Sequence, residues 1–171
     1  MILETERLCL RKIVSDDAPF ILELVNDPEW LRNIGDRGVR TLAEARDFIA
    51  DGPIASYSRH GYGLWLVKFT KTSTAIGLCG VLKRGNLDHP DLGYALLPAF
   101  RGAGYAIEAC KSVLEYARNS LRMQTVLAIV SPGNAKSISL LEKLSFEETG
   151  SVLMPGQDDE VLLYQRELAA P

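Results

Sequence analysis

The residues best suited to chemistry form a glycine-rich turn between a predicted strand and a predicted helix. An apolar run spans residues 91–97, and Arg101, Gly102 and Gly104 follow before a helical pattern begins. Glycine adopts positive φ readily and carries no Cβ, so successive main-chain N–H groups at this turn can converge on an anion. The next helix would direct its positive N-terminal end at the same point, and Arg101 adds a full charge. The pattern predicts a pyrophosphate site.

Two common nucleotide-binding designs do not fit this turn. A P-loop is excluded because the chain contains no GxxxxGK followed by serine or threonine. A Rossmann fingerprint would need a third glycine where Ile107 stands. It would also need an acidic residue about 20 positions further on to bind the ribose. No Asp or Glu occurs between Tyr116 and Leu141.

Three phrases of the sequence carry a resemblance to a known family. The signature Q/R-x-x-G-x-G/A is met by Arg101, Gly104 and Ala106, inside GYALLPAFRGAGYAIEA. TERLCLRKIVSDDAPFILELVNDPEW precedes it and NAKSISLLEKLSFEETG follows it. In this order the phrases resemble the GNAT acetyltransferase superfamily, in its RimJ/RimL-like branch of ribosomal-protein acetyltransferases. The resemblance covers nearly the whole chain, and it implies an α+β, GNAT-like fold: a mixed, strongly twisted sheet with splayed central strands, flanked by helices.

The resemblance also implies how acetyl-CoA binds. The pantetheine arm would enter between the splayed strands as though it were another strand, and the glycine turn would anchor the pyrophosphate. Residues 95–97 have no polar side chains, so their main-chain groups would pair with the arm. The implied cofactor-binding residues are Ala95, Leu96, Leu97, Arg101, Gly102, Ala103, Gly104, Tyr105, Ala106, Asn134 and Ser137.

The candidate catalytic residues depart from the wider superfamily. Many members place a tyrosine acid where this chain has Leu141, and some place a glutamate base where it has Ile129. The RimL-like branch instead has a serine at Ser137, which would hydrogen-bond the departing CoA sulfur. Asn134 lies three residues earlier, on the same helical face, and is equally typical of an N-cap.

The sequence does not identify the general base. The acidic residues expected to border the cleft are Asp91, Asp158, Asp159 and Glu160, and any of them could equally be a solvated loop acid. An α-amine with a pKa near 8 is about 10% free base at pH 7, whereas a lysine with a pKa near 10.4 is about 0.04%. The difference is worth about 3 kcal/mol, so an α-amine needs only an ordered water path.

The elements that must position these residues alternate between strands and helices. The patterns predict strands over residues 7–13, 62–70, 75–84, 91–97, 125–130, 147–154 and 160–168. They predict helices through residues 21–25, over 42–50 after a Thr41 capping box, over 104–119 and over 135–144. The first of these must end near Asn26, ahead of Pro28. Asp51-Gly52-Pro53 should stop the helix over residues 42–50.

Composition favours one enzyme-sized domain, residues 1–171. Hydrophobic residues make up 47% of the 171 residues, and the net charge of −3 offers no basic field for nucleic acid. No run approaches the roughly 20 apolar residues of a membrane span, and no secretory signal begins the chain, so we expect a cytoplasmic protein. The three cysteines and two histidines lack metal spacing. We expect no metal and no membrane partner, and the resemblance suggests a homodimer.

The predicted function is therefore acetyl-CoA-dependent N-acetylation of a primary amine, with a protein or peptide N-terminal α-amine as the acceptor. The amine would attack the thioester directly while both substrates are bound. Residues expected to wall the acceptor site are Arg32, Asn33, Tyr57, Trp65 and Tyr94. Two alternatives stay open: a small-molecule enzyme acting on a polyamine, amino sugar or drug, and a catalytically silent acyl-CoA-binding module.

Overall fold

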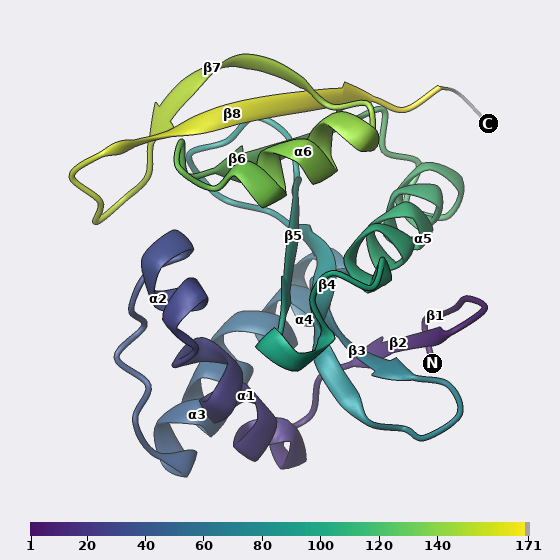
Figure 1. Ribbon diagram of the computed structural model, residues 1–171, viewed down its shortest axis with the longest axis vertical. Coiled ribbons are helices and arrows are strands. Elements are labelled where there is room, and N and C mark those ends of the chain that lie inside the picture. The colour runs from purple at the N-terminus through teal and green to yellow at the C-terminus, as the bar shows by residue number, and fades with distance from the viewer. Residues whose placement is uncertain (170–171) are drawn as a thin grey trace.

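One eight-stranded sheet runs through the molecule in the order β1-β2-β3-β4-β5-β6-β8-β7 (Figure 1). The computed structural model describes residues 1–169, and the last two residues of the expected domain, 170 and 171, lie outside the described residues. The strands are β1 (Leu3–Glu4), β2 (Leu8–Lys12), β3 (Leu64–Phe69), β4 (Ala75–Leu82), β5 (Asp91–Leu96), β6 (Thr125–Val130), β7 (Glu147–Leu153) and β8 (Glu160–Glu167). Only β5 and β6 pair in parallel, so the sheet is mixed, as predicted.

Six α-helices flank this sheet within residues 1–169. In Figure 1, α1, α2 and α3 gather at the lower left, α5 lies to the right, and α6 lies beneath β7 and β8. They are α1 (Ala18–Val25), α2 (Pro28–Asn33), α3 (Leu42–Ile49), α4 (Ala55–His60), α5 (Tyr105–Asn119) and α6 (Ala135–Lys143).

Two hydrophobic cores hold these helices to opposite faces of the sheet. Val113 and Leu141 join α5 and α6 to one face, whereas Ile21 and Ala45 join α1 and α3 to the other. Successive strand residues alternate between the cores, since side chains along a strand point to opposite faces. The site must therefore lie between two helical layers.

The central strands splay apart beside the glycine turn. β5 and β6 pair at the amino end of β5, where Asp91 lies opposite Leu127 and the Leu127 N–H donates to the Pro90 carbonyl at 2.9 Å. From there β5 stays paired with β4, and β6 with β8. The two strands consequently diverge toward Leu96, which confirms the predicted splay.

The predicted helix stop after residue 50 is wrong. A π-helical turn (Ala50–Ile54) carries the chain from α3 directly into α4, and the helix ends at Gly61, whose φ is +78°. Pro53 has no N–H to donate, and the wider turn absorbs it without ending the helix. The capping box at Thr41 is confirmed.

Helix α2 was not predicted, because Pro28 was read only as the end of the preceding helix. The Asp27 side chain accepts hydrogen bonds from the N–H groups of Glu29 and Trp30. Pro28 occupies the first helical position, where a missing N–H costs nothing. Asp27 and Pro28 together therefore start a new helix rather than only ending the previous one.

Candidate active site between the splayed strands

Every second residue of β5 directs its main-chain N–H and C=O toward the gap between β5 and β6. The Leu97 N–H donates to a β4 carbonyl at 2.9 Å, and the Ala95 carbonyl also lies against β4. The N–H and C=O of one residue point to the same side of an antiparallel strand, so Ala95 is committed to β4. The Leu97 carbonyl, beyond the end of β5, accepts instead from the Phe100 N–H at 3.0 Å. The main-chain groups of Tyr94 and Leu96 point toward the gap instead. The structure thus corrects the expectation for Ala95 and Leu97: of residues 95–97, Leu96 alone directs its main chain at the gap.

The glycine turn has the predicted conformation. Gly102 has φ +78° and Gly104 has φ +80°, and Gly104 is the N-cap of α5. The first N–H groups of a helix have no partner within it, so those that follow Gly104 can bind an anion. Gly102, Gly104, Tyr105 and Ala106 all line the cavity described below.

Arg7 holds this turn from outside, a role that the sequence analysis missed. Its Nη1 donates to the Ala103 carbonyl at 3.1 Å, and its guanidinium lies 4.5 Å from the centre of the Tyr105 ring. Its Nε donates to Glu108 at 2.6 Å, in the first turn of α5. No local pattern signals a contact between residues about one hundred positions apart. Ala103 is exposed and does not line the cavity, so it supports the turn through the hydrogen bond that its carbonyl accepts from Arg7.

The Arg101 side chain turns back onto α2. Its Nη2 lies 2.6 Å from Asp27, its Nη1 lies 3.1 Å from Glu29, and its Nε donates to the Leu96 carbonyl at 3.0 Å. Two carboxylates therefore offset the charge that was expected to face the pyrophosphate. Arg101 lines the cavity but joins the end of β5 to the N-terminus of α2.

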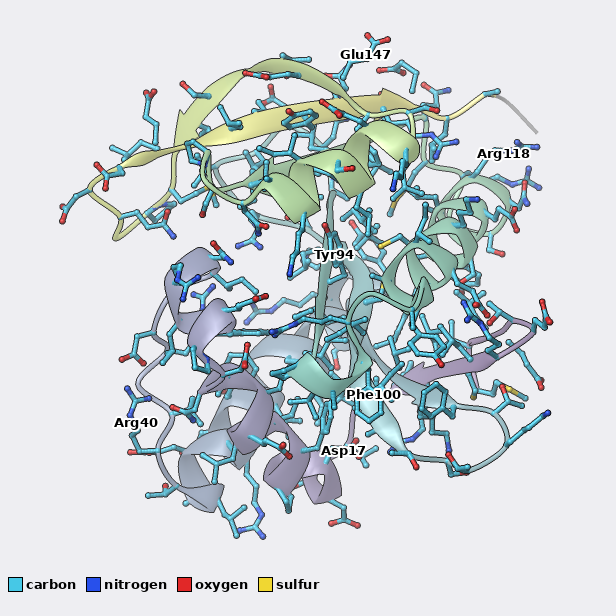
Figure 2. The ribbon with its side chains drawn as sticks, in the orientation of Figure 1. Asp17, Arg40, Tyr94, Phe100, Arg118 and Glu147 are labelled. Carbon is cyan, nitrogen blue, oxygen red and sulfur yellow. The ribbon has the colours of Figure 1, made fainter. Side chains whose placement is uncertain are left out.

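Ser137 meets Tyr94 across the gap. The hydroxyls of the two residues share a short hydrogen bond, and the Ser137 N–H donates to Oδ1 of Asn134 at 3.2 Å. Asn134 is thus an N-cap of α6 and also lines the cavity. Figure 2 shows Tyr94 near the middle of the molecule, below α6. Burial raises the pKa of Tyr94 well above its usual value, so its hydroxyl stays protonated.

The splayed strands open into a cavity of about 1310 Å³. Its lining joins the glycine turn to β5, α2 and the start of α6. The predicted cofactor-binding and catalytic residues that line it are Asp91, Ala95, Leu96, Arg101, Gly102, Gly104, Tyr105, Ala106, Asn134 and Ser137.

Asp91 lies in the cavity wall at the amino end of β5. Its side chain is 1% exposed, and both carboxylate oxygens accept from the Arg84 Nε, at 3.0 and 3.1 Å. Burial raises the pKa of Asp91, and the charge of Arg84 only partly opposes that shift. A carboxylate with a raised pKa in a cavity is a reasonable candidate base.

Glu160 has no place in this cavity, which corrects its proposed role. It is exposed at the start of β8, where its carboxylate accepts a hydrogen bond from the Ser151 hydroxyl at 2.5 Å. Asp158 and Asp159 are likewise exposed and outside the lining. The β7–β8 hairpin pairs Glu160 with Leu153, and its neighbour Val161 lines the cavity although Glu160 does not.

The expected acceptor wall is only partly correct. Asn33 and Tyr94 line the cavity, whereas Arg32, Tyr57 and Trp65 do not. The Tyr57 hydroxyl donates to the Leu64 carbonyl and accepts from the Ile13 N–H, so it ties β3 to β2. Trp65 is 1% exposed and packs edge-on against Tyr116 in the core.

Two further findings concern residues 1–169 as a whole. No helix among them is both long and apolar enough to cross a membrane. The same residues contain no group of three or more His, Cys, Asp or Glu side chains arranged to hold a metal ion. Cys110 is fully buried in the core, on the face of α5 that packs against the sheet.

Comparison with known proteins identifies the architecture. The family model described as an acetyltransferase (GNAT) domain matches residues 7–147. The uncharacterized N-acetyltransferase p20 of Bacillus licheniformis is 32% identical over 151 residues, which cover 86% of this chain and 83% of that protein. A crystal structure of an acetyltransferase from Agrobacterium tumefaciens aligns with a TM-score of 0.81 at 27% identity, covering 97% of this chain and 94% of that one.

A second solved structure shares the fold at lower identity. It is RimL, a ribosomal L7/L12 α-N-protein acetyltransferase in complex with coenzyme A, which aligns with a TM-score of 0.83 at 20% identity over 99% of each chain. The family match covers most of the sequence, and the splayed strands, glycine turn and cavity agree with it. The chain belongs to the GNAT acetyltransferase family, whose members are acetyl-CoA-dependent acyltransferases.

Proposed function

We propose that this enzyme acetylates the N-terminal α-amine of a peptide or protein, by direct attack on acetyl-CoA held between β5 and β6. The observation that carries the proposal is the divergence of β5 from β6 beside the glycine turn. It leaves the Leu96 N–H, and a Leu96 carbonyl that already accepts from Arg101, facing a cavity bordered by the first N–H groups of α5. A slot of this kind suits an amide-bearing arm that ends in a pyrophosphate.

The pyrophosphate would lie at the turn formed by Gly102 and Gly104, against the N-terminus of α5. Because Asp27 and Glu29 already pair with Arg101, the main-chain N–H groups would supply most of the anion binding. The solved RimL structure contains coenzyme A, and its fold resemblance supports this placement.

Ser137 would stabilise the departing thiolate. The Ser137 hydroxyl has one proton, so if that proton points toward the sulfur, Ser137 can only accept in its hydrogen bond with Tyr94, and Tyr94 is the donor of that bond. The raised pKa of Tyr94 keeps that donor protonated throughout the neutral range. A main-chain N–H of the splayed strand would bind the carbonyl oxygen as negative charge develops there.

An α-amine acceptor fits a site whose predicted base is already engaged. Asp91 is the carboxylate of the proposed base set that lines the cavity, and Arg84 occupies both of its oxygens. An α-amine with a pKa near 8 needs little help to lose its proton at pH 7, whereas a lysine or polyamine amine must overcome about 3 kcal/mol more. Water in the cavity is sufficient to accept the proton.

A direct test is the release of free CoA thiol with a panel of N-terminal peptides, polyamines and aminoglycosides. We expect peptides with free α-amines to be acetylated and their N-terminally blocked counterparts to be inert. Turnover with polyamines or aminoglycosides alone would instead make the chain a small-molecule acetyltransferase. Binding without turnover of any amine would favour a silent acyl-CoA-binding module.

A further inference from the structure

Cationic side chains gather at the end of the cavity opposite the glycine turn. Strand β5 runs from Asp91 to Leu96, and the turn follows its carboxyl end. Arg84 lies at the other end, where it pairs with the buried Asp91. Arg37, on the loop between α2 and α3, also lines the cavity. Burial lowers the pKa of Arg37, and the positive charge of the nearby Arg84 lowers it further.

Arg37 is a cation at this end that Asp91 does not offset. The Asp91 carboxylate accepts from Arg84 Nε through both of its oxygens, at 3.0 and 3.1 Å, so Arg84 and Asp91 offset each other. Trp30 lines the same cavity from α2, but its indole Nε1, which has no hydrogen-bond partner within residues 1–169, is buried and does not reach the cavity. Arg37 is therefore a donor that this end of the cavity offers to a ligand.

Resting on the proposed function, we propose that Arg37 binds a carboxylate of the peptide acceptor, on the side chain of its second or third residue. A guanidinium is a donor without acceptor capacity, which matches a carboxylate. Tyr94 marks the reacting centre, and Asp91 lies three strand residues away, roughly 10 Å at about 3.3 Å per residue. A side-chain carboxylate on the second or third residue reaches this far from the α-amine. The carboxylate of a free amino acid does not.

Two other occupants fit the arrangement less well. The phosphates of CoA belong at the glycine turn, at the far end of β5 from Arg84. A polyamine would bring further positive charge toward Arg37, which Arg84 already repels. Of the other carboxylates in the lining, Asp27 and Glu29 pair with Arg101, and Asp51 is the third. The charge at the Arg37 end therefore favours an acidic peptide.

The test compares peptides that differ only in glutamate, glutamine or lysine at the second position. We expect kcat/KM to be about tenfold higher for glutamate than for glutamine, and lowest for lysine. Arg37→Ala should raise KM for the glutamate peptide alone and bring the glutamate and glutamine values within about twofold. Arg37→Glu should favour lysine. Arg46→Ala removes an exposed arginine on α3, outside the cavity lining, and should keep the wild-type preference.

The results distinguish a failure of this inference from a failure of the proposed function. Equal kcat/KM for the glutamate and glutamine peptides, or an unchanged preference in Arg37→Ala, would overturn this inference and leave the proposed function intact. A rise in KM for acetyl-CoA in Arg37→Ala would assign the charge to the cofactor and overturn it as well. If no peptide is acetylated while spermidine is, the proposed function falls and this inference falls with it.

Discussion

Replacing Gly104 with valine tests whether the glycine turn binds the cofactor. Gly104 has φ +80°, and a Cβ there would lie 3.4 Å from Nη2 of Arg7. The contact itself is ordinary, so the cost comes from the backbone. A β-branched residue in the left-handed region is strained by about 1–3 kcal/mol. In the free enzyme the turn can relax toward negative φ, but its N–H groups then leave the positions that face the anion. Binding must restore the strained turn, so Kd for acetyl-CoA should rise between about fivefold and about 150-fold.

Calorimetric titration with acetyl-CoA measures this change, and thermal unfolding shows whether the variant is folded. The matched control is Gly133→Val, because Gly133 lacks positive φ, lies outside the cavity lining, and has no heavy atom within 4 Å of an added Cβ. We expect the control to bind acetyl-CoA within about twofold of wild type. A folded Gly104→Val enzyme with wild-type Kd would mean that the turn takes no part in cofactor binding.

Three more predictions follow from the site and its supports. Ser137→Ala should lower kcat about tenfold to a thousandfold, and Tyr94→Phe about threefold to tenfold, because both hydroxyls act where charge develops on sulfur. Kd for acetyl-CoA should stay within about threefold of wild type in both variants, and an unchanged single-turnover rate in Ser137→Ala would show that Ser137 is a packing residue. With a peptide acceptor, kcat/KM should rise with pH and level off near pH 8 in both wild type and Asp91→Asn, because the group that titrates is the α-amine of the peptide. A midpoint below pH 7 that moves in Asp91→Asn would instead identify Asp91, whose pKa is raised by burial, as the base. Partial burial opposes ionisation of Glu108, but hydrogen bonds from the β1–β2 turn outweigh it and lower the pKa of Glu108. The ionised form therefore stabilises the fold above the unfolded pKa, and this stability is lost as pH falls through the folded pKa. Glu108→Gln should lower the free energy of unfolding by about 1–2 kcal/mol at pH 7 in urea titrations, and a deficit that persists at about pH 3 would contradict this assignment.

Local patterns predicted the elements of the fold and the glycine turn, because periodicity, capping and positive φ are properties of short segments. The capping box at Thr41 and the conformation of Gly104 are examples. Asp27 and Pro28 also carried a local helix signal, but Pro28 was interpreted as a stop. The structure shows that the same proline starts α2.

Contacts between distant segments were not predictable from the sequence. Arg101 was expected at the pyrophosphate, yet it pairs with Asp27, 74 positions away. Tyr94 was placed on the acceptor wall, and strand alternation alone could not show that its hydroxyl meets Ser137 on α6. Glu160 follows an acidic loop, and no sequence pattern shows that its neighbour Val161 lines the cavity while Glu160 does not. Such partners depend on how the layers pack, which no short pattern encodes.

The most direct test of the central claim is to locate the transferred acetyl group by mass spectrometry. The substrate is a peptide with both a free α-amine and a lysine, incubated with enzyme and acetyl-CoA near pH 7. We predict one acetyl group per peptide, on the N-terminal nitrogen, with one CoA thiol released for each peptide modified. Acetylation of the lysine side chain, or thiol release with small amines but not with any peptide, would contradict the assignment of this enzyme as an α-amine acetyltransferase.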